Sequence, residues 1–213
     1  YGNWNNNQII ELADLLDRSK KYAVSDLISK MKAFGYTTET LEFMLLPLVT
    51  ELRDPLGSMG NDAALACLSD KPRMIYDYFK QLFAQITNPP IDSIREEIIM
   101  SLECLIGPEG NLLSTDENNV KRLRLEHPIL SNQELEKIRS IKTKGYKSKT
   151  IDITYKKGLG KKGLTKALDK ICKESLKAID EGYSFIILSD KSIASEKLAL
   201  STLLACSTVH NYL

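Results

Sequence analysis

The chain has 213 residues, of which 43% are hydrophobic and 27% are charged, and this is the composition of an ordinary globular protein with a buried core. Its 29 basic and 28 acidic side chains almost cancel, so the net charge gives no reason to expect a nucleic-acid partner. No secretory signal is recognisable, and no apolar run approaches the roughly 20 residues that cross a bilayer, so we expect a cytoplasmic protein without a membrane partner.

Helical periodicity predicts a helix-rich part over residues 1–105. The expected helices span residues 8–16, 25–34, 37–54, 75–88 and 92–105. Pro47 should kink or divide the third helix, and Asp92 should cap the last one.

The pattern changes after residue 105, and residues 106–213 are predicted to form an α/β part. A turn at residues 107–110 leads into a candidate short strand at 110–115, and Ser131 with Glu134 forms a capping box for a helix to about residue 141. The elements expected next are a strand over 151–155, a helix over 164–181, a strand over 183–190, and a closing helix from Ser192 or Ser195 to Cys206. This βαβα order predicts an α/β fold in which two adjacent parallel strands are joined by a right-handed crossover.

Four cysteines are spread along the sequence, at Cys67, Cys104, Cys172 and Cys206. They form no C-x-x-C pair, and no histidine lies at metal-ligand spacing from them, so neither a metal site nor a disulfide framework is predicted. We expect reduced and mostly buried thiols, as in a cytosolic protein.

A glycine-rich stretch lies between the first strand of the α/β part and its helix. Gly158, Gly160 and Gly163 match G-x-G-x-x-G, and Asp190 ends the next strand, where an acidic ribose ligand would lie in a dinucleotide-binding fold. Two lysines precede the first glycine, where that motif would lead from an apolar strand end directly into a tight turn. The stretch is therefore either a nucleotide- or phosphate-binding loop or a flexible, lysine-rich connection.

The same region carries most of the positive charge. Between Lys142 and Lys173 there are eleven lysines and two acidic residues. This stretch is either a patch for phosphate or an acidic partner, or simply a solvated face.

No catalytic arrangement follows from the spacing of the remaining polar residues. His127 and His210 have no serine or cysteine motif to pair with. Asp92, Glu96 and Glu97 lie where a helix begins, which explains their charge without catalysis. We therefore predict no catalytic residue and no metal ligand in this chain.

Two polar blocks punctuated by glycine and proline remain, GSMGND at residues 57–62 and a second block over residues 81–92. The stretches SMGND, YDYFKQLFAQITNPPIDSIREE, MSLECLIGPEGNLL and EGYSFIILSD, in this order and at this spacing, resemble the central domain of the glutamate synthase large chain. The resemblance covers nearly the whole sequence. Ser93 departs from the family pattern, in which proline follows NPPID.

The resemblance implies a single central domain over residues 1–213, cut from a longer chain, with a helical N-terminal half and an α/β topology that resembles a rudimentary TIM (FMN-type) barrel. In that family a glutamine amidotransferase domain releases ammonia, and an FMN domain uses it to convert 2-oxoglutarate to glutamate. The implied partners are those two domains of the same chain, with an NADPH-oxidising small subunit or ferredoxin as electron donor of the parent enzyme. FMN and an iron–sulfur cluster are implied for other domains, and no cofactor for this one.

The two polar blocks are the candidate interdomain interface, because glycine and proline fix the backbone while polar side chains offer hydrogen bonds. The candidate residues are Ser58, Met59, Asn61, Asp62, Gln81, Gln85, Asn88, Pro89, Pro90 and Asp92. The alternative is that these blocks only cap and connect helices. For the whole chain, the connecting role competes with an autonomous phosphate- or nucleotide-binding module built on residues 158–163 and Asp190.

Overall fold

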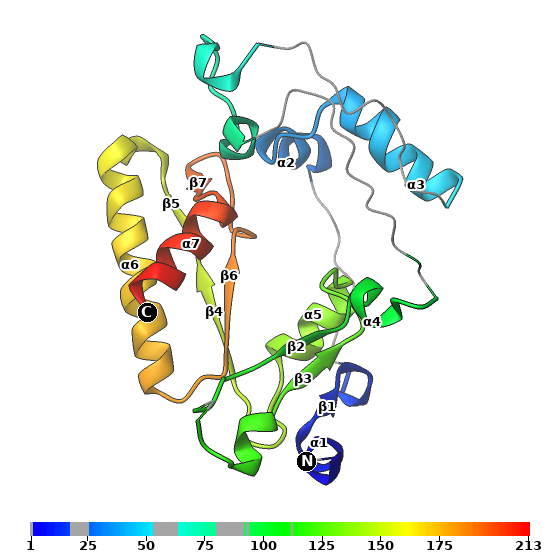
Figure 1. Ribbon diagram of the computed structural model, residues 1–213. Coiled ribbons are helices and arrows are strands. Elements are labelled where there is room, and N and C mark those ends of the chain that lie inside the picture. The colour runs from blue at the N-terminus through cyan, green and yellow to red at the C-terminus, as the bar shows by residue number, and fades with distance from the viewer. Residues whose placement is uncertain (1, 18–25, 53–63, 80–91, 93, 112) are drawn as a thin grey trace. The chain divides into compact units, whose positions relative to one another are not determined.

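The computed structural model describes residues 2–17, 26–52, 64–79, 92, 94–111 and 113–213 (Figure 1). The chain divides into two compact units, one made of residues 1–21 and 92–213 and the other of residues 22–91. Each unit is described by itself below.

A three-stranded sheet opens the first unit. Its strands β1 (Ile10–Glu11), β3 (Leu123–Leu125) and β2 (Cys104–Ile106) lie in the order β1-β3-β2, with β1 parallel and β2 antiparallel to β3. Helix α1 (Gly2–Gln8) precedes β1, and the short helix α4 (Glu97–Met100) precedes β2.

Helix α5 (Asn132–Arg139) begins at the predicted capping box, which is confirmed. Ser131 Oγ accepts a hydrogen bond from the Glu134 backbone N–H at 3.2 Å, and the Ser131 N–H donates to Glu134 Oε2 at 2.7 Å. Two of the N–H groups that a helix start leaves without intrahelical partners are thus satisfied.

The βαβ unit predicted from the sequence is present. Strands β4 (Ser148–Asp152) and β6 (Phe185–Ser189) pair in parallel, in register from Ser148 with Phe185 to Asp152 with Ser189. Helix α6 (Gly160–Asp180) connects them and packs along the pair (Figure 1). Gly182, with a φ of +76°, stands just beyond the end of α6, as predicted, because this backbone conformation is easily adopted only by glycine.

A second pairing follows directly on the first. Strand β5 (Thr154–Lys156) is antiparallel to β7 (Lys197–Ala199), and helix α7 (Thr202–Tyr212) then packs against α6. The predicted strand over 151–155 is therefore split at Ile153. The predicted closing helix starts later than Ser192 or Ser195 because residues 194–199 are used in pairing, which the apolar pattern alone did not reveal.

Two apolar cores hold this unit together. The first joins the three-stranded sheet to α5 and to the start of β6, and its largest buried members are Tyr146, Leu123 and Phe185. The second lies between β4, α6 and α7, around Ile151, Ile153, Ile171, Leu200 and Ala205. The prediction of a mixed α/β fold with parallel strands is confirmed by these elements and their packing.

The second unit contains α2 (Leu27–Ala33), a π-helix (Thr40–Leu45), α3 (Leu46–Thr50) and the 3-10 helices Ala66–Leu68 and Ile75–Phe79. Pro47 lies in the first turn of α3, where the predicted helix over 37–54 changes from π to α form between Leu45 and Leu46 while the backbone stays helical. Most of the predicted helix over 75–88 lies outside the described residues. None of the described residues of this unit is buried.

Three other sequence-based predictions are wrong, each for a local or long-range reason. Residues 8–16 are not one helix, because the Ile10 N–H bonds to the Arg122 carbonyl at 2.9 Å and starts a strand. The helix predicted over 92–105 is only four residues long, because the chain becomes extended at Ser101 and enters β2. Residues 110–115 do not form a strand in their described part, since the Asn111 side chain accepts from the Leu113 N–H at 3.0 Å and closes a turn.

The cysteines were expected to be mostly buried, and this is also wrong. Cys172 is buried and Cys104 partly so, but Cys67 and Cys206 are exposed. On α7 the side chains that face the core are Ala205 and Val209, and Cys206 follows the first of them on the outer side. Among the described residues, no helix is long and apolar enough to span a membrane.

Replacing Ser131 with alanine removes the side-chain half of the capping box on α5. We expect Ser131→Ala to lower the free energy of unfolding by about 1 kcal/mol, and Ser131→Asp, which keeps a capping oxygen, to lower it much less. Urea unfolding at neutral pH measures both. Equal losses in the two variants would show that the cap is not what Ser131 contributes.

Candidate interdomain interface

The predicted interface residues fall almost entirely outside the part of the chain that the structure describes. Asp92 alone is described, and the other nine are Ser58, Met59, Asn61, Asp62, Gln81, Gln85, Asn88, Pro89 and Pro90. Their proposed role therefore stays a prediction.

Asp92 acts locally as a cap. Its Oδ1 accepts hydrogen bonds from the backbone N–H groups of Ile94, at 2.9 Å, and Arg95, at 3.1 Å. Arg95 Nε lies 3.7 Å from its other carboxylate oxygen, in an exposed ion pair that contributes little energy. Asp92 thus fixes the direction in which the chain leaves the second polar block.

An exposed apolar segment follows immediately, and we call it the 94–102 segment. Its apolar members are Ile94, Ile98, Ile99, Met100 and Leu102, which are between 50 and 88% exposed. Single exposed apolar side chains are common on protein surfaces, but a contiguous group of them is typical of a contact surface for another protein domain.

Ion pairs and a strand anchor this segment at its C-terminal end. Arg124 on β3 binds Glu103, with 3.4 Å between Nε and Oε2, and Glu11 on β1, with 2.7 Å between Nη1 and Oε1. Cys104 then pairs with Leu125 in the sheet. The contacts of Asp92 at the other end stay within residues 92–96, so the apolar side chains stand on a short stretch that is capped at its start and anchored to the sheet at its end.

The exposed 94–102 segment was not predicted from the sequence, which indicated only a helix over residues 92–105. One signal could have found it. Ile98, Ile99 and Met100 are consecutive, and a helix of 3.6 residues per turn cannot direct three consecutive side chains to one core.

The glycine-rich stretch does not have the arrangement of a dinucleotide-binding loop. It follows β5, which pairs antiparallel to β7, whereas in the dinucleotide fold the glycine turn follows the parallel strand directly. The Lys157 N–H donates to the Glu196 carbonyl at 3.1 Å, so the chain's own β7 hairpin holds the entrance to the loop.

The three positions also differ in whether the structure needs a glycine there. Gly160 has a φ of +49°, and Gly158 has open space around its Cα. A Cβ on Gly163 would lie 2.6 Å from Leu159 Cβ and 3.2 Å from a ring carbon of Tyr155, so this glycine is needed where α6 packs closely on β5. Asp190 is partly buried after β6, and its carbonyl accepts from the Ile193 N–H at 3.1 Å in a turn.

Asp152, at the carboxyl end of β4, has a carboxylate that accepts several hydrogen bonds. Burial by itself would raise the pKa of Asp152, but hydrogen bonds from Thr154 and Ser192 and the charge of Lys197 outweigh it and lower that pKa below its ordinary value. The Thr154 N–H lies 2.9 Å from Asp152 Oδ1. Asp152 thus ties the break between β4 and β5 to the loop before β7.

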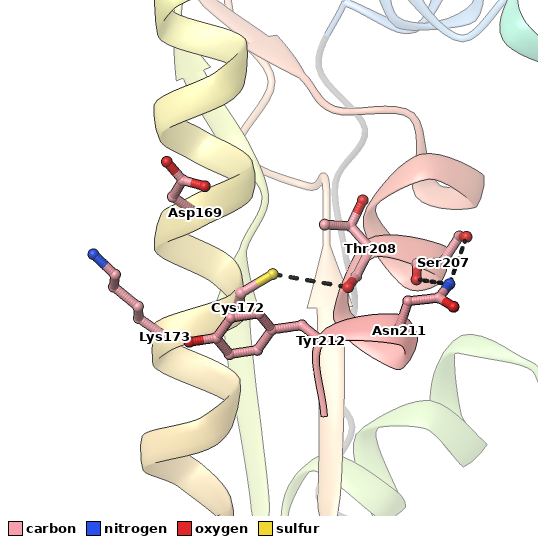
Figure 2. A pocket seen from close by; sticks show the side chains of 7 residues that line it. All are labelled: Asp169, Cys172, Lys173, Ser207, Thr208, Asn211 and Tyr212. Atoms are coloured by element: carbon pink, nitrogen blue, oxygen red, sulfur yellow. Dashed lines mark hydrogen bonds between the residues drawn. The ribbon is translucent and has the colours of Figure 1, made fainter.

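A cleft of about 480 Å³ lies between α6 and α7 (Figure 2). Asp169, Cys172 and Lys173 line it from α6, and Ser207 and Tyr212 from α7. Burial, with a smaller effect of the Asp169 charge, raises the pKa of the Cys172 thiol, which therefore stays protonated at neutral pH and is not a reactive nucleophile. In the described part of the chain, no group of three or more His, Cys, Asp or Glu side chains could hold a metal ion.

The glycine loop can be tested by a matched pair of substitutions. Gly163→Ala should destabilise the protein by about 1–3 kcal/mol because the new methyl group overlaps Leu159 and Tyr155. Gly158→Ala should change stability by less than about 1 kcal/mol, because nothing lies within 4 Å of the new atom. Chemical unfolding gives both values, and a larger effect at Gly158 would contradict this account of the loop.

The Asp152 hydrogen bonds predict an acid-dependent loss of stability. A carboxylate whose pKa is lowered in the folded state stabilises the fold above its unfolded pKa of about 3.9, and this contribution is lost as the pH falls through the folded pKa. The stability advantage of the unmodified protein over Asp152→Asn should therefore be full near neutral pH and shrink below about pH 4. Unfolding curves for both proteins between neutral pH and about pH 3 measure this difference, and a constant difference would show that the carboxylate charge is not involved.

Comparison with known proteins identifies the family. A model of the glutamate synthase central domain matches residues 29–213. The chain is 42% identical over 226 residues to the NADH glutamate synthase of Schizosaccharomyces pombe, covering 100% of the chain and 11% of that protein. It is 40% identical to the NADPH glutamate synthase large chain of Bacillus subtilis, covering 100% of the chain and 14% of that protein. It is 35% identical to the chloroplastic ferredoxin-dependent glutamate synthase of Spinacia oleracea, covering 100% of the chain and 13% of that protein. The chain thus spans about one eighth of the length of these relatives, and it belongs to the glutamate synthase central domain family.

Proposed function

We propose that this chain is the noncatalytic connecting domain of a cytoplasmic glutamate synthase. In this proposal it links a glutamine amidotransferase domain to an FMN-binding synthase domain and supports internal transfer of ammonia, so that glutamate is formed from glutamine and 2-oxoglutarate. The family match supports the parent enzyme, and the exposed 94–102 segment is the observation that supports an interface role.

The energetics of the 94–102 segment favour a covered state. Burying a fully exposed isoleucine or leucine side chain stabilises an assembly by about 1.5–3 kcal/mol. Ile94 and Ile98 are 87 and 88% exposed, so nearly all of that stabilisation is available to a domain that packs on them. The ion pairs of Arg124 hold the adjoining strand in place, which reduces the conformational entropy lost on docking.

The two polar blocks are proposed as interface candidates in their own right, from their composition. Asp92, the last residue of the second block, bonds to the backbone of Ile94 and Arg95, so a domain that covers the segment would also meet Asp92. Polar groups at the rim of an apolar contact are the usual arrangement of protein interfaces. In the proposal these groups keep the two catalytic domains in register and help to exclude water from the ammonia path.

The order β4–α6–β6–α7 fits a further part of the proposal, that this domain is a rudimentary relative of an FMN-type barrel. FMN and the iron–sulfur cluster are assigned to other domains of the parent enzyme, and we propose that residues 158–163 bind no dinucleotide. Relatives named for NADH, NADPH and ferredoxin are all 35–42% identical to this chain. We infer that the choice between an NADPH-oxidising small subunit and ferredoxin is made elsewhere in the parent enzyme.

The interface role can be tested in the complete parent enzyme. Ile98→Ser with Ile99→Ser should remove about 1.5–3 kcal/mol of contact energy per side chain and loosen the coupling of the two catalytic domains. Glutamate formed per glutamine hydrolysed should fall, while FMN content stays normal. Asn88→Ala and Asp62→Ala are expected to act in the same direction.

Ile129→Ser is the matched control, because Ile129 is 80% exposed and lies away from the 94–102 segment in the sequence. It should leave the ratio of glutamate to hydrolysed glutamine unchanged. If the double variant kept full coupling and lost only thermal stability, the segment would be structural and the interface role would be wrong.

A further inference from the structure

An open cavity with basic residues in its lining lies at the connection between α5 and β4, and the proposed connecting role does not use it. The cavity has a volume of about 390 Å³, and Arg139, Lys142, Tyr146, Lys147 and Tyr183 contribute to its lining. Residues 139–149 contain five basic side chains and no acidic one. The chain segment that lines most of the cavity is therefore strongly basic.

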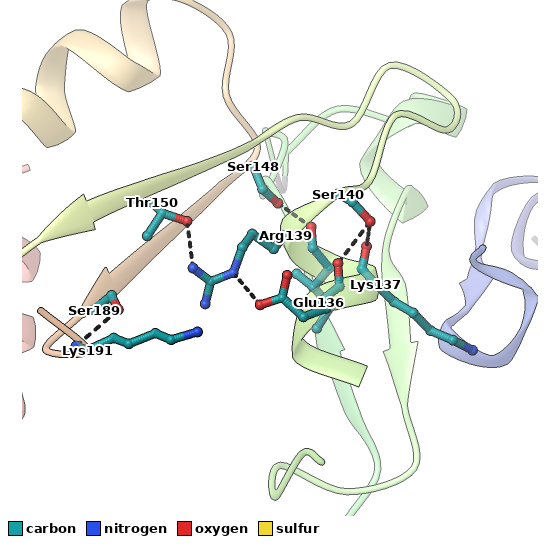
Figure 3. A network of polar contacts seen from close by, with 9 residues as sticks. Glu136, Lys137, Arg139, Ser140, Ser148, Thr150, Ser189 and Lys191 are labelled. Atoms are coloured by element: carbon teal, nitrogen blue, oxygen red, sulfur yellow. Dashed lines mark hydrogen bonds and ion pairs between the residues drawn. The ribbon is translucent and has the colours of Figure 1, made fainter. Parts of the chain in front are cut away.

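Arg139 is the one lining cation whose charge is already balanced. Its Nε lies 3.0 Å from Glu136 Oε1, with both side chains at most 26% exposed, and its Nη1 reaches Thr150 Oγ1 at 3.5 Å (Figure 3). This network joins α5 to β4. Arg139 thus shapes the cavity wall, and Glu136 cancels its charge.

Lys142 and Lys147 remain uncompensated. Among the described residues, neither has a hydrogen bond from its ammonium group or an ion pair, and both are exposed at the cavity. Two further ammonium groups lie against the rings of lining residues, Lys149 over Tyr183 at 5.6 Å and Lys121 over Tyr146 at 5.0 Å. The carboxylate of Glu181 pairs with Lys177 at 3.7 Å. Lys142 and Lys147 are therefore the lining lysines that have no ionic partner among the described residues.

The other polar groups of the cavity add no negative charge. Burial raises the pKa of Tyr146, with a smaller opposing effect of Arg122, so its phenol is neutral at physiological pH. The hydroxyls of Ser140 and Ser148 donate to the carbonyls of Glu136 and Ile138 and so satisfy the end of α5 (Figure 3). The carbonyls at this helix end, which would repel an anion, are partly screened in this way.

We propose that this cavity binds a small doubly charged oxyanion, of the phosphate or dicarboxylate class, between Lys142 and Lys147. Two free ammonium groups match two negative charges, and charge-assisted hydrogen bonds to oxyanions are the strongest that lysine makes. A cavity bounded by a turn and by the Tyr183 ring admits a compact ion more readily than an acidic protein segment. This inference is independent of the proposed connecting role.

The test is a binding titration on the complete parent enzyme with its FMN bound. Inorganic phosphate is titrated by calorimetry at constant ionic strength, and 2-oxoglutarate forms a second arm. The double variant Lys142→Gln/Lys147→Gln should weaken one saturable site roughly tenfold or more. If the double variant binds phosphate more weakly, the ligand class is phosphate. If it binds 2-oxoglutarate more weakly, the ligand class is a dicarboxylate.

Two controls separate a specific site from general attraction. Lys161→Gln/Lys162→Gln removes the same charge from the same basic stretch but not from the cavity, and should leave the affinity unchanged. Lys142→Arg/Lys147→Arg should keep most of the binding. The proposal is overturned if neither dianion binds saturably, if the double variant binds as well as the unmodified enzyme, if the two Gln pairs weaken binding equally, or if only an acidic peptide binds.

Discussion

The fold of the first unit depends on the backbone of Ile153. Its N–H donates to the Ser189 carbonyl at 3.0 Å and extends the parallel ladder of β4 and β6, while its carbonyl accepts from the Leu200 N–H at 3.0 Å and holds the chain that leads into α7. The Ile153 side chain is fully buried in the core under α6. One residue therefore joins the parallel pair, the β5–β7 pair and the last helix. Beyond Ile153 the chain pairs with β7 instead of continuing the parallel ladder, and this places the glycine-rich stretch after an antiparallel pair and not at the parallel strand end where a nucleotide loop would lie.

The β4–β6 pair has an apolar face, which packs in the second core, and a polar face, which contacts α5 beside the proposed binding cavity. Ile151 and Ile153 face α6 and α7 and supply the second core. The alternate residues Ser148 and Thr150 are polar and meet α5, where Thr150 contacts Arg139. A polar face on this side allows the connection from α5 to β4 to carry several lysines without burying them. The basic cavity is thus a consequence of how α5 is attached to the sheet, and its wall is as rigid as that attachment.

The sequence was sufficient where structure depends on neighbouring residues. Local chemistry or strong periodicity accounts for the Ser131–Glu134 capping box, the end of α6 at Gly182 and the parallel β4–β6 pair. It failed where partners are distant. Strand β1 has two residues and exists only because Leu123 and Arg124 lie beside it, and β5 separates from β4 only because residues 197–199 return to pair with it. The predicted interface blocks lie mostly outside the described residues, and the 94–102 segment was missed because the sequence indicated one helix over 92–105 where the chain leaves the helix at Ser101 to pair in the sheet.

The stability of the second unit also depends on contacts with distant polypeptide. In residues 26–52 and 64–79 no side chain is buried, and Phe43, Val49 and Leu52 are between 68 and 88% exposed. A small domain normally buries about 60% of the surface that its unfolded chain exposes, and hydrophobic burial is the main force that offsets the loss of chain entropy. Contacts among these described residues do not provide such burial, so polypeptide beyond them must provide it. A unit whose apolar residues are covered only by further polypeptide is stable in its assembled state, which is what the proposed connecting role would require.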